Sequence, residues 1–437
     1  MGFVDTSLRR CGCWALALLC PAGAANAAGL VSDRPNYFPI GVWQQPTNSF
    51  SKWAARGINT VMEVPEGHNL SAWSDAAARS GFLMLREPDN GARPGDPKAV
   101  AAARRADLTK YRSNLLAWTL SDEPDFNARP TSEVRAEYKA LKAVDPKNPP
   151  KVLVNFSGGT VLGTGTRTGD SVPNVRYQRY LEGTDWASND IYPVTGWGRS
   201  DWIDYSRPAA DRKTPGMAIE KLKQLSGNKP QLAVIETSDQ NLAWVPGDHG
   251  VNRDQFRGQL WHSIIHGAKG IMYFPFQFRD RFTFDATPAA VAEEMTIQHA
   301  RVQRLASVIN APVDPKNLGF VPGSKKAAQL LEVTWRRGRG ADYFFVLNMS
   351  GTKVDLPFDF VGVNGDGVIH GEGRTLRDDS AGKYRDRFAP WEMHVYKFAH
   401  PLGGRAVLSA VAVPEPTSAA AALVCAAGLL LRRRGRN

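Results

Sequence analysis

Short apolar runs alternate with segments of helical periodicity between residues 37 and 311 of this chain. Each run is brief and continuous, which is the pattern of a strand that is buried on both faces of a parallel sheet. In the intervening segments, apolar residues recur every three or four positions, as they do on one face of a helix. The predicted strands are 38–42, 60–63, 82–85, 115–120, 152–156, 190–192, 232–235 and 270–274.

Several of the intervening helices carry start signals. Thr131 is the expected N-cap of one helix, Asn252 with Gln255 forms a capping-box variant, and Pro288 opens the last long helix. Eight strand–helix units over residues 37–311 fit the size of a (β/α)8 barrel. A doubly wound open sheet is the alternative, but no Gly-x-Gly-x-x-Gly turn follows the first strand. We therefore predict the α/β class with a (β/α)8 TIM barrel.

The pattern changes after residue 312, where strand-like runs are separated by turns rich in Gly, Asn and Asp. This predicts a small C-terminal antiparallel β-sandwich domain over residues 317–400, followed by a linker at 401–412. The strand-like runs are 330–335, 343–347, 353–358 and 393–398.

The first 27 residues read as a secretory signal peptide. Arg9 and Arg10 form its basic start, residues 13–19 its apolar core, and a small-residue cleavage site ends at Ala27. A membrane anchor is the alternative, but the apolar core is shorter than the ~20 residues that a span requires. A lipoprotein signal through Cys20 is disfavoured because Leu19 occupies a position where a small residue is expected.

The last 25 residues, 413–437, contain Val413-Pro414-Glu415-Pro416, then an apolar run at 419–431, then three arginines. This order resembles the Pro-Glu-Pro sorting tail of bacterial exosortase substrates. The resemblance implies export across the inner membrane of a Gram-negative cell, transient anchoring by the tail, and removal of the tail by an exosortase-type enzyme. An ordinary single-pass tail anchor is the alternative, but the run is shorter than the ~20 residues that a stable span needs.

All four cysteines lie in these two end segments, at positions 11, 13, 20 and 425. The body of the protein is therefore expected to lack disulfides, thiolate metal sites and a cysteine nucleophile. The formal charge of +11 falls by four without the end segments, because they hold six arginines and two acidic residues. The remaining excess is spread along the chain, and no arrangement indicates readout of nucleic acid.

Two glutamates directly follow predicted buried strands, in Ser121-Asp122-Glu123-Pro124 and in Val234-Ile235-Glu236-Thr237. In a parallel barrel, all strands open at their carboxyl ends on one face, where active sites lie. Two carboxylates on that face are what acid-assisted cleavage of a glycosidic bond requires. The structural alternatives are that Asp-Glu-Pro caps a loop and that Glu236 pairs with an arginine.

Counting units places Glu123 after strand 4 and Glu236 after strand 7. This placement resembles the large clan of retaining glycoside hydrolases with (β/α)8 barrels. The resemblance implies that Glu123 is the acid/base, with a raised pKa, and that Glu236 is the nucleophile, with a low pKa. The clan usually has Asn directly before the acid/base, where this chain has Asp122. An ionised carboxylate cannot donate a hydrogen bond to a sugar hydroxyl, although it can raise the pKa of its neighbour.

Further polar and aromatic residues near strand ends are candidates for substrate binding. They are Asp122, Asn155, Asp190, Tyr192, Trp43, Trp197 and Trp244. The aromatic residues suit stacking on sugar rings, because the C–H face of a sugar is apolar. For Tyr192 the alternative is packing under a Pro turn, and for each tryptophan it is packing in the protein interior. The rival carboxylates at the ends of strands 2 and 3 are Glu63, Glu66, Glu87 and Asp89.

No cofactor or metal ion is expected. The histidines lack the clustered spacing of a metal site, and His262 and His266 are interpreted as two positions of one helix. No Gly-x-Ser-x-Gly elbow is present. The sequence thus predicts an exported retaining glycoside hydrolase that cleaves β-glycosidic bonds of an extracellular poly- or oligosaccharide. The alternatives are an inactive barrel that acts as a carbohydrate-binding or matrix protein, and an enzyme of different chemistry on the same barrel.

Overall fold

The computed structural model describes residues 34–92, 95–163, 165–195, 214–239, 250–278, 281–312, 317–338, 340–379 and 383–400. The predicted signal peptide, linker and sorting tail lie outside these ranges. Within them, no helix combines the length and the apolar character that crossing a membrane demands.

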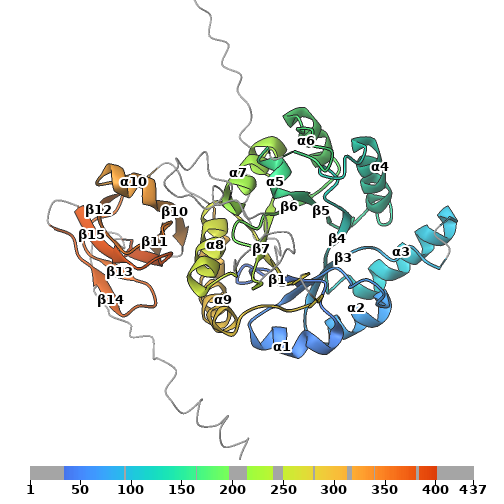
Figure 1. Cartoon of the computed structure of the whole chain (residues 1–437), viewed down its shortest axis with the longest axis horizontal. Coiled ribbons are helices and arrows are strands. Elements are labelled where there is room, and N and C mark those ends of the chain that lie inside the picture. The colour runs from blue at the N-terminus through green and yellow to red at the C-terminus, as the bar shows by residue number, and fades with distance from the viewer. Residues whose placement is uncertain are drawn as a thin grey trace, which may run out of the picture. The chain divides into compact units, whose positions relative to one another are not determined.

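Eight parallel strands close into a barrel in the order β1 to β8, with helices around it (Figure 1). This confirms the predicted barrel, because each strand pairs in parallel with the next and β1 pairs with β8. The strands are β1 Ile40–Trp43, β2 Thr60–Met62, β3 Leu83–Arg86, β4 Leu115–Asp122, β5 Val152–Ser157, β6 Trp186–Asp190, β7 Gln231–Glu236 and β8 Ile271–Phe274.

Helices follow most of the strands and bury their apolar faces against the outer surface of the barrel (Figure 1). They are η1 Thr47–Ser49, α1 Phe50–Ala55, α2 Leu70–Arg79, α3 Pro97–Tyr111, α4 Thr131–Lys142, α5 Gly158–Val161, α6 Asn174–Leu181, α7 Pro215–Ser226, α8 Arg253–Ile265 and α9 Ala289–Ile309.

Local signals placed the helices well, with one exception. The capping box of α8 is present in full, since Asn252 accepts from the backbone of Gln255 and the Gln255 side chain accepts from the backbone of Asn252. Pro288 directly precedes α9. The prediction for α4 was wrong, because Thr131 is already helical and the cap position is Pro130, which offers no side-chain bond.

The predicted position of strand 6 at 190–192 was also wrong, because β6 spans Trp186–Asp190. Ser188 and Asn189, in the middle of this strand, are polar yet completely buried. A search for apolar runs passes over such a strand, because these polar residues end the run after Trp186 and Ala187. The consequence is that Asp190 ends β6 at the carboxyl face of the barrel instead of beginning the strand.

Alternation along β7 determines where Glu236 points. Ala233 and Ile235 pack in a cluster that includes residues of the outer helices. Leu232 and Val234 belong to a cluster made of strand and strand-end residues, which is the barrel interior. Side chains alternate between the two faces of a strand, so Glu236 lies on the interior side above Val234.

The C-terminal domain confirms the predicted antiparallel β-sandwich. One sheet has the order β10-β11-β16-β13-β14 and the other β15-β12-β9, and phenylalanine and tyrosine side chains from both sheets fill one shared cluster. The short strands β9, β13, β14 and β15 were not predicted. The elements are β9 Gly319–Pro322, α10 Lys325–Leu330, β10 Leu331–Gly338, β11 Ala341–Asn348, β12 Val354–Val361, β13 Gly367–Ile369, β14 Arg374–Leu376, β15 Lys383–Phe388 and β16 Met393–Ala399.

Helices α8 and α9 contact the sandwich. Arg257 of α8 donates to the backbone oxygen of Trp391 at 3.1 Å, and Arg301 of α9 donates to that of Met393 at 3.0 Å. The Trp261 ring of α8 packs on Phe345 of β11, with ring centroids 6.2 Å apart. Apolar residues of both domains consequently share one core cluster.

Candidate active site

The structure places the two predicted catalytic glutamates at the carboxyl end of the barrel. Glu236 is the last residue of β7, and Glu123 directly follows β4, where its backbone N–H still bonds the oxygen of Asn155 on β5 at 3.0 Å. Because the strands are parallel, both residues emerge on the same face. The strand counts on which the two positions depended are therefore correct.

Glu236 is completely buried beneath the segment that follows β6. Its Oε1 accepts a hydrogen bond from the backbone of Val194 at 2.6 Å. Its Oε2 accepts from the backbone and from the hydroxyl of Thr195, at 2.7 and 2.6 Å. Burial raises the pKa of Glu236 to about 7, and these donors oppose that rise because they favour the anion. The low pKa expected for this residue is thus not found.

Glu123 is half-buried, and its pKa is raised to about 7. Burial is the main cause, and the negative charges of Asp122 and Asp125 add to it. This agrees with the raised pKa predicted for an acid/base and with the predicted influence of Asp122. Asp125 is buried and fixed by bonds from the backbone of Ser157 at 3.1 Å and from the Tyr177 hydroxyl at 2.8 Å.

Three residues after the ends of barrel strands hold a left-handed backbone that side chains other than glycine rarely adopt. They are Gln44 (φ 40°), Glu63 (φ 57°) and Glu123 (φ 41°), after β1, β2 and β4. Each backbone N–H nevertheless continues the hydrogen bonding to the next strand. Such conformations cost on the order of 1–3 kcal/mol each and concentrate at functional sites. Their recurrence at one end of the barrel therefore favours this face as the active site.

Asp122 and Asn155 form a pair at the ends of β4 and β5. The Asn155 amide donates to Asp122 Oδ1 at 2.9 Å, and the Ser188 hydroxyl donates to Asn155 Oδ1 at 2.7 Å. Asn155 is buried, whereas Asp122 is exposed and lines a cavity. The predicted donor Asn155 is thus engaged in holding Asp122 within the site.

Asp190, at the end of β6, also lines the cavity, and its pKa is raised well above the usual range by burial and by the charges of Glu123 and Asp122. The Tyr192 hydroxyl donates to Asp190 Oδ2 at 3.3 Å. The Tyr192 ring stacks on Phe274 at 5.0 Å between centroids. The structure therefore brings Asp190 and Tyr192 into the site and directs the tyrosine hydroxyl at Asp190.

Trp43 connects the cavity to Glu63, which the sequence indicated as a rival of the two predicted catalytic glutamates. Its indole N–H donates to Glu63 Oε2 at 3.0 Å, and its ring meets Phe274 edge-on at 6.1 Å. Burial, with the charges of Asp122 and Glu87, raises the pKa of Glu63 to about 8. Trp43 lines the cavity although it is 4% exposed.

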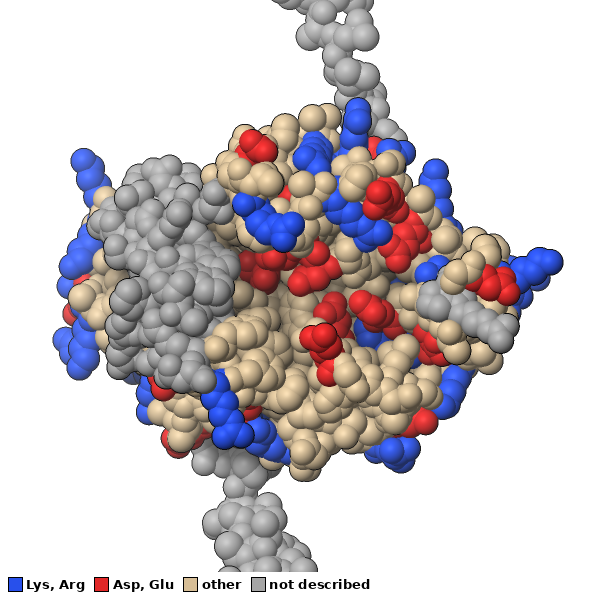
Figure 2. Space-filling model, turned by 45° about the vertical axis from the view of Figure 1, so that its right-hand side comes forward, with Lys and Arg blue, Asp and Glu red and all other residues tan. Residues whose placement is uncertain are grey.

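The cavity has a volume of about 560 Å³, and one wall of it is made of phenylalanines that sequence reasoning missed. Figure 2 shows acidic side chains gathered around a hollow on one face of the protein. Glu66, Asp122 and Asp190 are acidic lining residues of the cavity. The signal for the wall was present in the chain, as phenylalanine at every second position in two short runs. This phenylalanine wall comprises Phe274, Phe276, Phe278, Phe282 and Phe284.

Other predicted residues do not contribute in the described structure. Trp197 and Trp244 lie outside the described residues. Asp89 is used in a turn, where its Oδ1 accepts from the backbone of Gly91 at 2.8 Å, and Glu87 is exposed. The described residues contain one group suited to a metal ion, His262, His266 and Glu332, and none of the three lines the cavity.

Comparison with known protein families gives a match over the barrel. A family model described as glycoside hydrolase family 42, beta-galactosidase, matches residues 40–311. No curated protein sequence matches this chain.

Solved structures resemble it at low identity. Gan42B, a GH42 beta-galactosidase from G. stearothermophilus solved as a catalytic mutant, is 10% identical with a TM-score of 0.52, over 84% of this chain and 98% of that chain. The alpha-amylase of Geobacillus thermoleovorans, complexed with acarbose, is 10% identical with a TM-score of 0.54, over 84% and 99%. At such identities, these structures show a common fold.

Proposed function

Because the chain belongs to glycoside hydrolase family 42, described as beta-galactosidase, we propose that it cleaves β-glycosidic bonds with retention at the anomeric carbon. The observation that carries this proposal is the position of Glu123 directly after β4 and of Glu236 at the end of β7. They lie at the end of the barrel where a cavity with acidic and aromatic walls opens, and the cavity is lined by Asp122, the neighbour of Glu123. A sugar needs both kinds of wall, because its hydroxyls are polar and its C–H faces are apolar.

In the proposed reaction, Glu236 attacks the anomeric carbon while Glu123 protonates the leaving oxygen. The bond between the anomeric carbon and the leaving oxygen breaks, and a glycosyl ester of Glu236 forms. Glu123 then removes a proton from water, which attacks the same carbon and releases the sugar and the Glu236 carboxylate. Atoms and charge balance over the two steps, and Glu123 ends in its initial protonated form.

Both carboxyls have a pKa of about 7, so the division of roles rests on the groups that contact them. A pKa of about 7 keeps Glu123 protonated in a large fraction of molecules below neutral pH. Glu236 receives bonds from Val194 and Thr195, and these stabilise its anion, although burial opposes ionisation. The positive charge that develops on the sugar in the transition state favours that anion further.

The family name makes a β-galactoside the first substrate to test. The predicted signal peptide and sorting tail lead us to propose that the substrate is an extracellular poly- or oligosaccharide. On this proposal, the protein crosses the inner membrane and is held there by its tail. An exosortase-type enzyme then processes it for the cell surface or matrix.

A carbohydrate-binding barrel without activity is the second candidate, and two observations favour it. Asp122 replaces the amide expected before the acid/base, and Glu236 is completely buried. A binder of this kind would retain affinity for sugars and release no aglycone from any glycoside.

The test is a panel of nitrophenyl glycosides, beginning with the β-galactoside, with the product anomer followed by NMR. We expect the β-anomer to appear first. We also expect Glu123→Gln and Glu236→Gln to lower kcat/KM by roughly 10²-fold or more. Glu87→Gln is the matched control, since Glu87 is an exposed carboxylate that follows β3. Normal turnover by Glu236→Gln would remove it as nucleophile, and silence of the wild type across the panel would support the binder.

A further inference from the structure

His262 of α8, His266 at the C-terminal cap of that helix and a glutamate of the sandwich converge at the junction between the barrel and the C-terminal domain. His262 and His266 are one helical turn apart, and their ring centroids lie 4.4 Å from each other. Glu332, on β10, places Oε2 at 2.7 Å from His262 Nδ1 and at 2.6 Å from His266 Nε2. The His262 and Glu332 side chains are 1% and 10% exposed, so the group is largely shielded from water.

The outward nitrogen of each ring is also held. His262 Nε2 lies 2.6 Å from the Thr214 hydroxyl, and His266 Nδ1 lies 2.6 Å from Glu220 Oε1. Histidines that bind metals characteristically have a carboxylate or another oxygen on their second nitrogen, which fixes the orientation of the ring. Thr214 and Glu220 thus orient the two rings from outside. His262 Nδ1 and His266 Nε2 both point toward Glu332 Oε2.

The start of α7 leaves room for this arrangement. A Cβ on Gly216 would lie 2.5 Å from His266 Cδ2 and 2.6 Å from His262 Nε2. Only a residue without a side chain therefore lets α7 approach both rings so closely. The two imidazoles are confined between α7, α8 and β10, with their inward nitrogens toward Glu332.

We propose that His262 Nδ1, His266 Nε2 and the Glu332 carboxylate form a site for Zn²⁺ or a similar divalent transition-metal ion, with water as the fourth ligand. Imidazole and carboxylate are the ligand types that this ion prefers, and three protein ligands with one water make a tetrahedral site. The three ligand atoms lie within 4.8 Å of one another. Ligand atoms in a tetrahedral zinc site are about 3.3 Å apart. Glu332 Oε2, at 2.7 and 2.6 Å from the two nitrogens, must therefore withdraw from both for the ion to enter.

Protons balance when the ion enters. Without metal, both nitrogens of His266 face carboxylate oxygens and both carry hydrogen, as in an imidazolium. On loading, His266 Nε2 loses its proton to solvent and keeps Nδ1–H toward Glu220. His262 Nδ1 also faces a carboxylate oxygen and carries hydrogen without metal. On loading, this hydrogen is lost to solvent and Nε2 takes one up, so neutral His262 offers Nδ1 to the ion and donates from Nε2 to the Thr214 hydroxyl. No change of oxidation state is involved.

The site ties helix α8 of the barrel to strand β10 of the sandwich, and none of its three ligands lines the cavity. An ion that binds only the folded protein stabilises it. Zinc is therefore expected to raise the melting temperature, and a chelator to reverse the rise.

The test uses the purified full chain, stripped with EDTA and then titrated with Zn²⁺ against a chromophoric chelator. We expect about one equivalent to bind, and Co²⁺ in its place to give the intense visible absorption of a tetrahedral site. Glu332→Gln and His266→Gln should each weaken binding at least tenfold, as the loss of one of three protein ligands requires.

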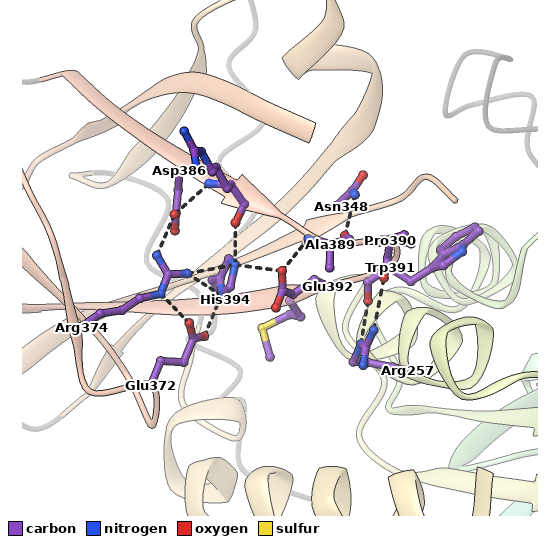
Figure 3. A network of polar contacts seen from close by, with 12 residues as sticks. Arg257, Asn348, Glu372, Arg374, Asp386, Ala389, Pro390, Trp391, Glu392 and His394 are labelled. Carbon is purple, nitrogen blue, oxygen red and sulfur yellow. Dashed lines mark hydrogen bonds and ion pairs between the residues drawn. The ribbon is translucent and has the colours of Figure 1, made fainter. Parts of the chain in front are cut away.

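His394→Gln is the matched control. His394 also lies beside a glutamate, with Nδ1 at 2.6 Å from Glu372, but the cationic Arg374 Nη2 lies 3.2 Å from its Nε2 (Figure 3). This variant should bind zinc as the wild type does. The proposal is overturned if the wild type binds no zinc, or if Glu332→Gln and His266→Gln bind it with unchanged affinity and an unchanged cobalt spectrum. If only one of the two variants folds, that variant decides.

Discussion

Carboxyl groups at the mouth of the barrel raise one another's pKa. Burial is the main cause for Glu63, Glu123 and Asp190, and the charge of Asp122 adds to the shift of each. The mouth of the barrel therefore disfavours further negative charge and favours a group that is becoming positive. A glycosyl transition state is such a group. The acidic residues at the strand ends therefore suit the proposed chemistry.

Replacing Asp122 by asparagine tests this coupling. Activity that requires protonated Glu123 should fall as pH rises through its pKa of about 7. Asp122→Asn removes a negative charge that raises this pKa, so the alkaline limb of kcat/KM should move to lower pH by roughly one unit. Glu66→Gln, another carboxylate of the cavity, should leave the limb in place because Glu66 is not among the groups that shift Glu123. A limb that stays fixed or moves to higher pH in Asp122→Asn would contradict the coupling.

The segment after β8 forms a hairpin whose side chains make most of the phenylalanine wall. Gln277 and Thr283 pair by two backbone hydrogen bonds, of 3.1 and 2.9 Å. Positions on either side of this pair share one face, which brings Phe278 opposite Phe282 with ring centroids 5.6 Å apart. These two rings are 45% and 46% exposed, so they add little to the core and are available to a ligand.

We expect the exposed and buried members of the wall to respond differently to truncation. Phe278→Ala should raise KM for glycosides with an aromatic aglycone by up to about tenfold and change the melting temperature little. Phe276, which is 3% exposed, is the matched residue, and Phe276→Ala should lower the stability by roughly 3–5 kcal/mol. Kinetics on aryl and alkyl glycosides, with calorimetry, separate the two effects. An unchanged KM in Phe278→Ala would exclude the outer ring from substrate binding.

The barrel and the sandwich are joined by a polar network as well as by shared apolar packing. Figure 3 shows that Arg257 contacts the backbone of Pro390 and Trp391. It also shows the charged group around His394 in the same network. Trp391 has a left-handed backbone (φ 55°), and its ring lies against α8 at Gly258. A Cβ on Gly258 would lie 2.7 Å from the Trp391 ring. The junction therefore depends on one helical position without a side chain.

Adding a methyl group at this position should separate the two domains slightly. Gly258→Ala is expected to destabilise the protein by roughly 1–3 kcal/mol, because the Trp391 ring must move out of its packing. Gly351→Ala is the control, since its Cβ would meet the same ring at 3.8 Å, an ordinary contact distance. Thermal unfolding of both variants measures the difference. Equal melting temperatures would show that the Trp391 ring can move without destabilising the protein.

Local patterns in the chain were sufficient to predict the barrel, the order of its strands and the β-sandwich. They worked because a buried strand and a capped helix each leave a signal within a few residues, as at Asn252 and along β7. The prediction failed at β6, where Ser188 and Asn189 are buried although both are polar, and where the Ser188 hydroxyl donates to Asn155. It also passed over the short strands of the sandwich, whose pairing is decided by their neighbours.

The sequence by itself determined that Glu123 and Glu236 follow the fourth and seventh strands, since counting units needs only their order. Only the tertiary structure decided the surroundings of these residues. It placed Val194 and Thr195 on Glu236, Asp122 beside Asn155, and Glu332 between two histidines of another domain. The physical reason is the distance along the chain over which each interaction acts. Backbone periodicity acts over a few residues, whereas burial, charge and hydrogen bonding at a site depend on segments that meet only in the folded chain.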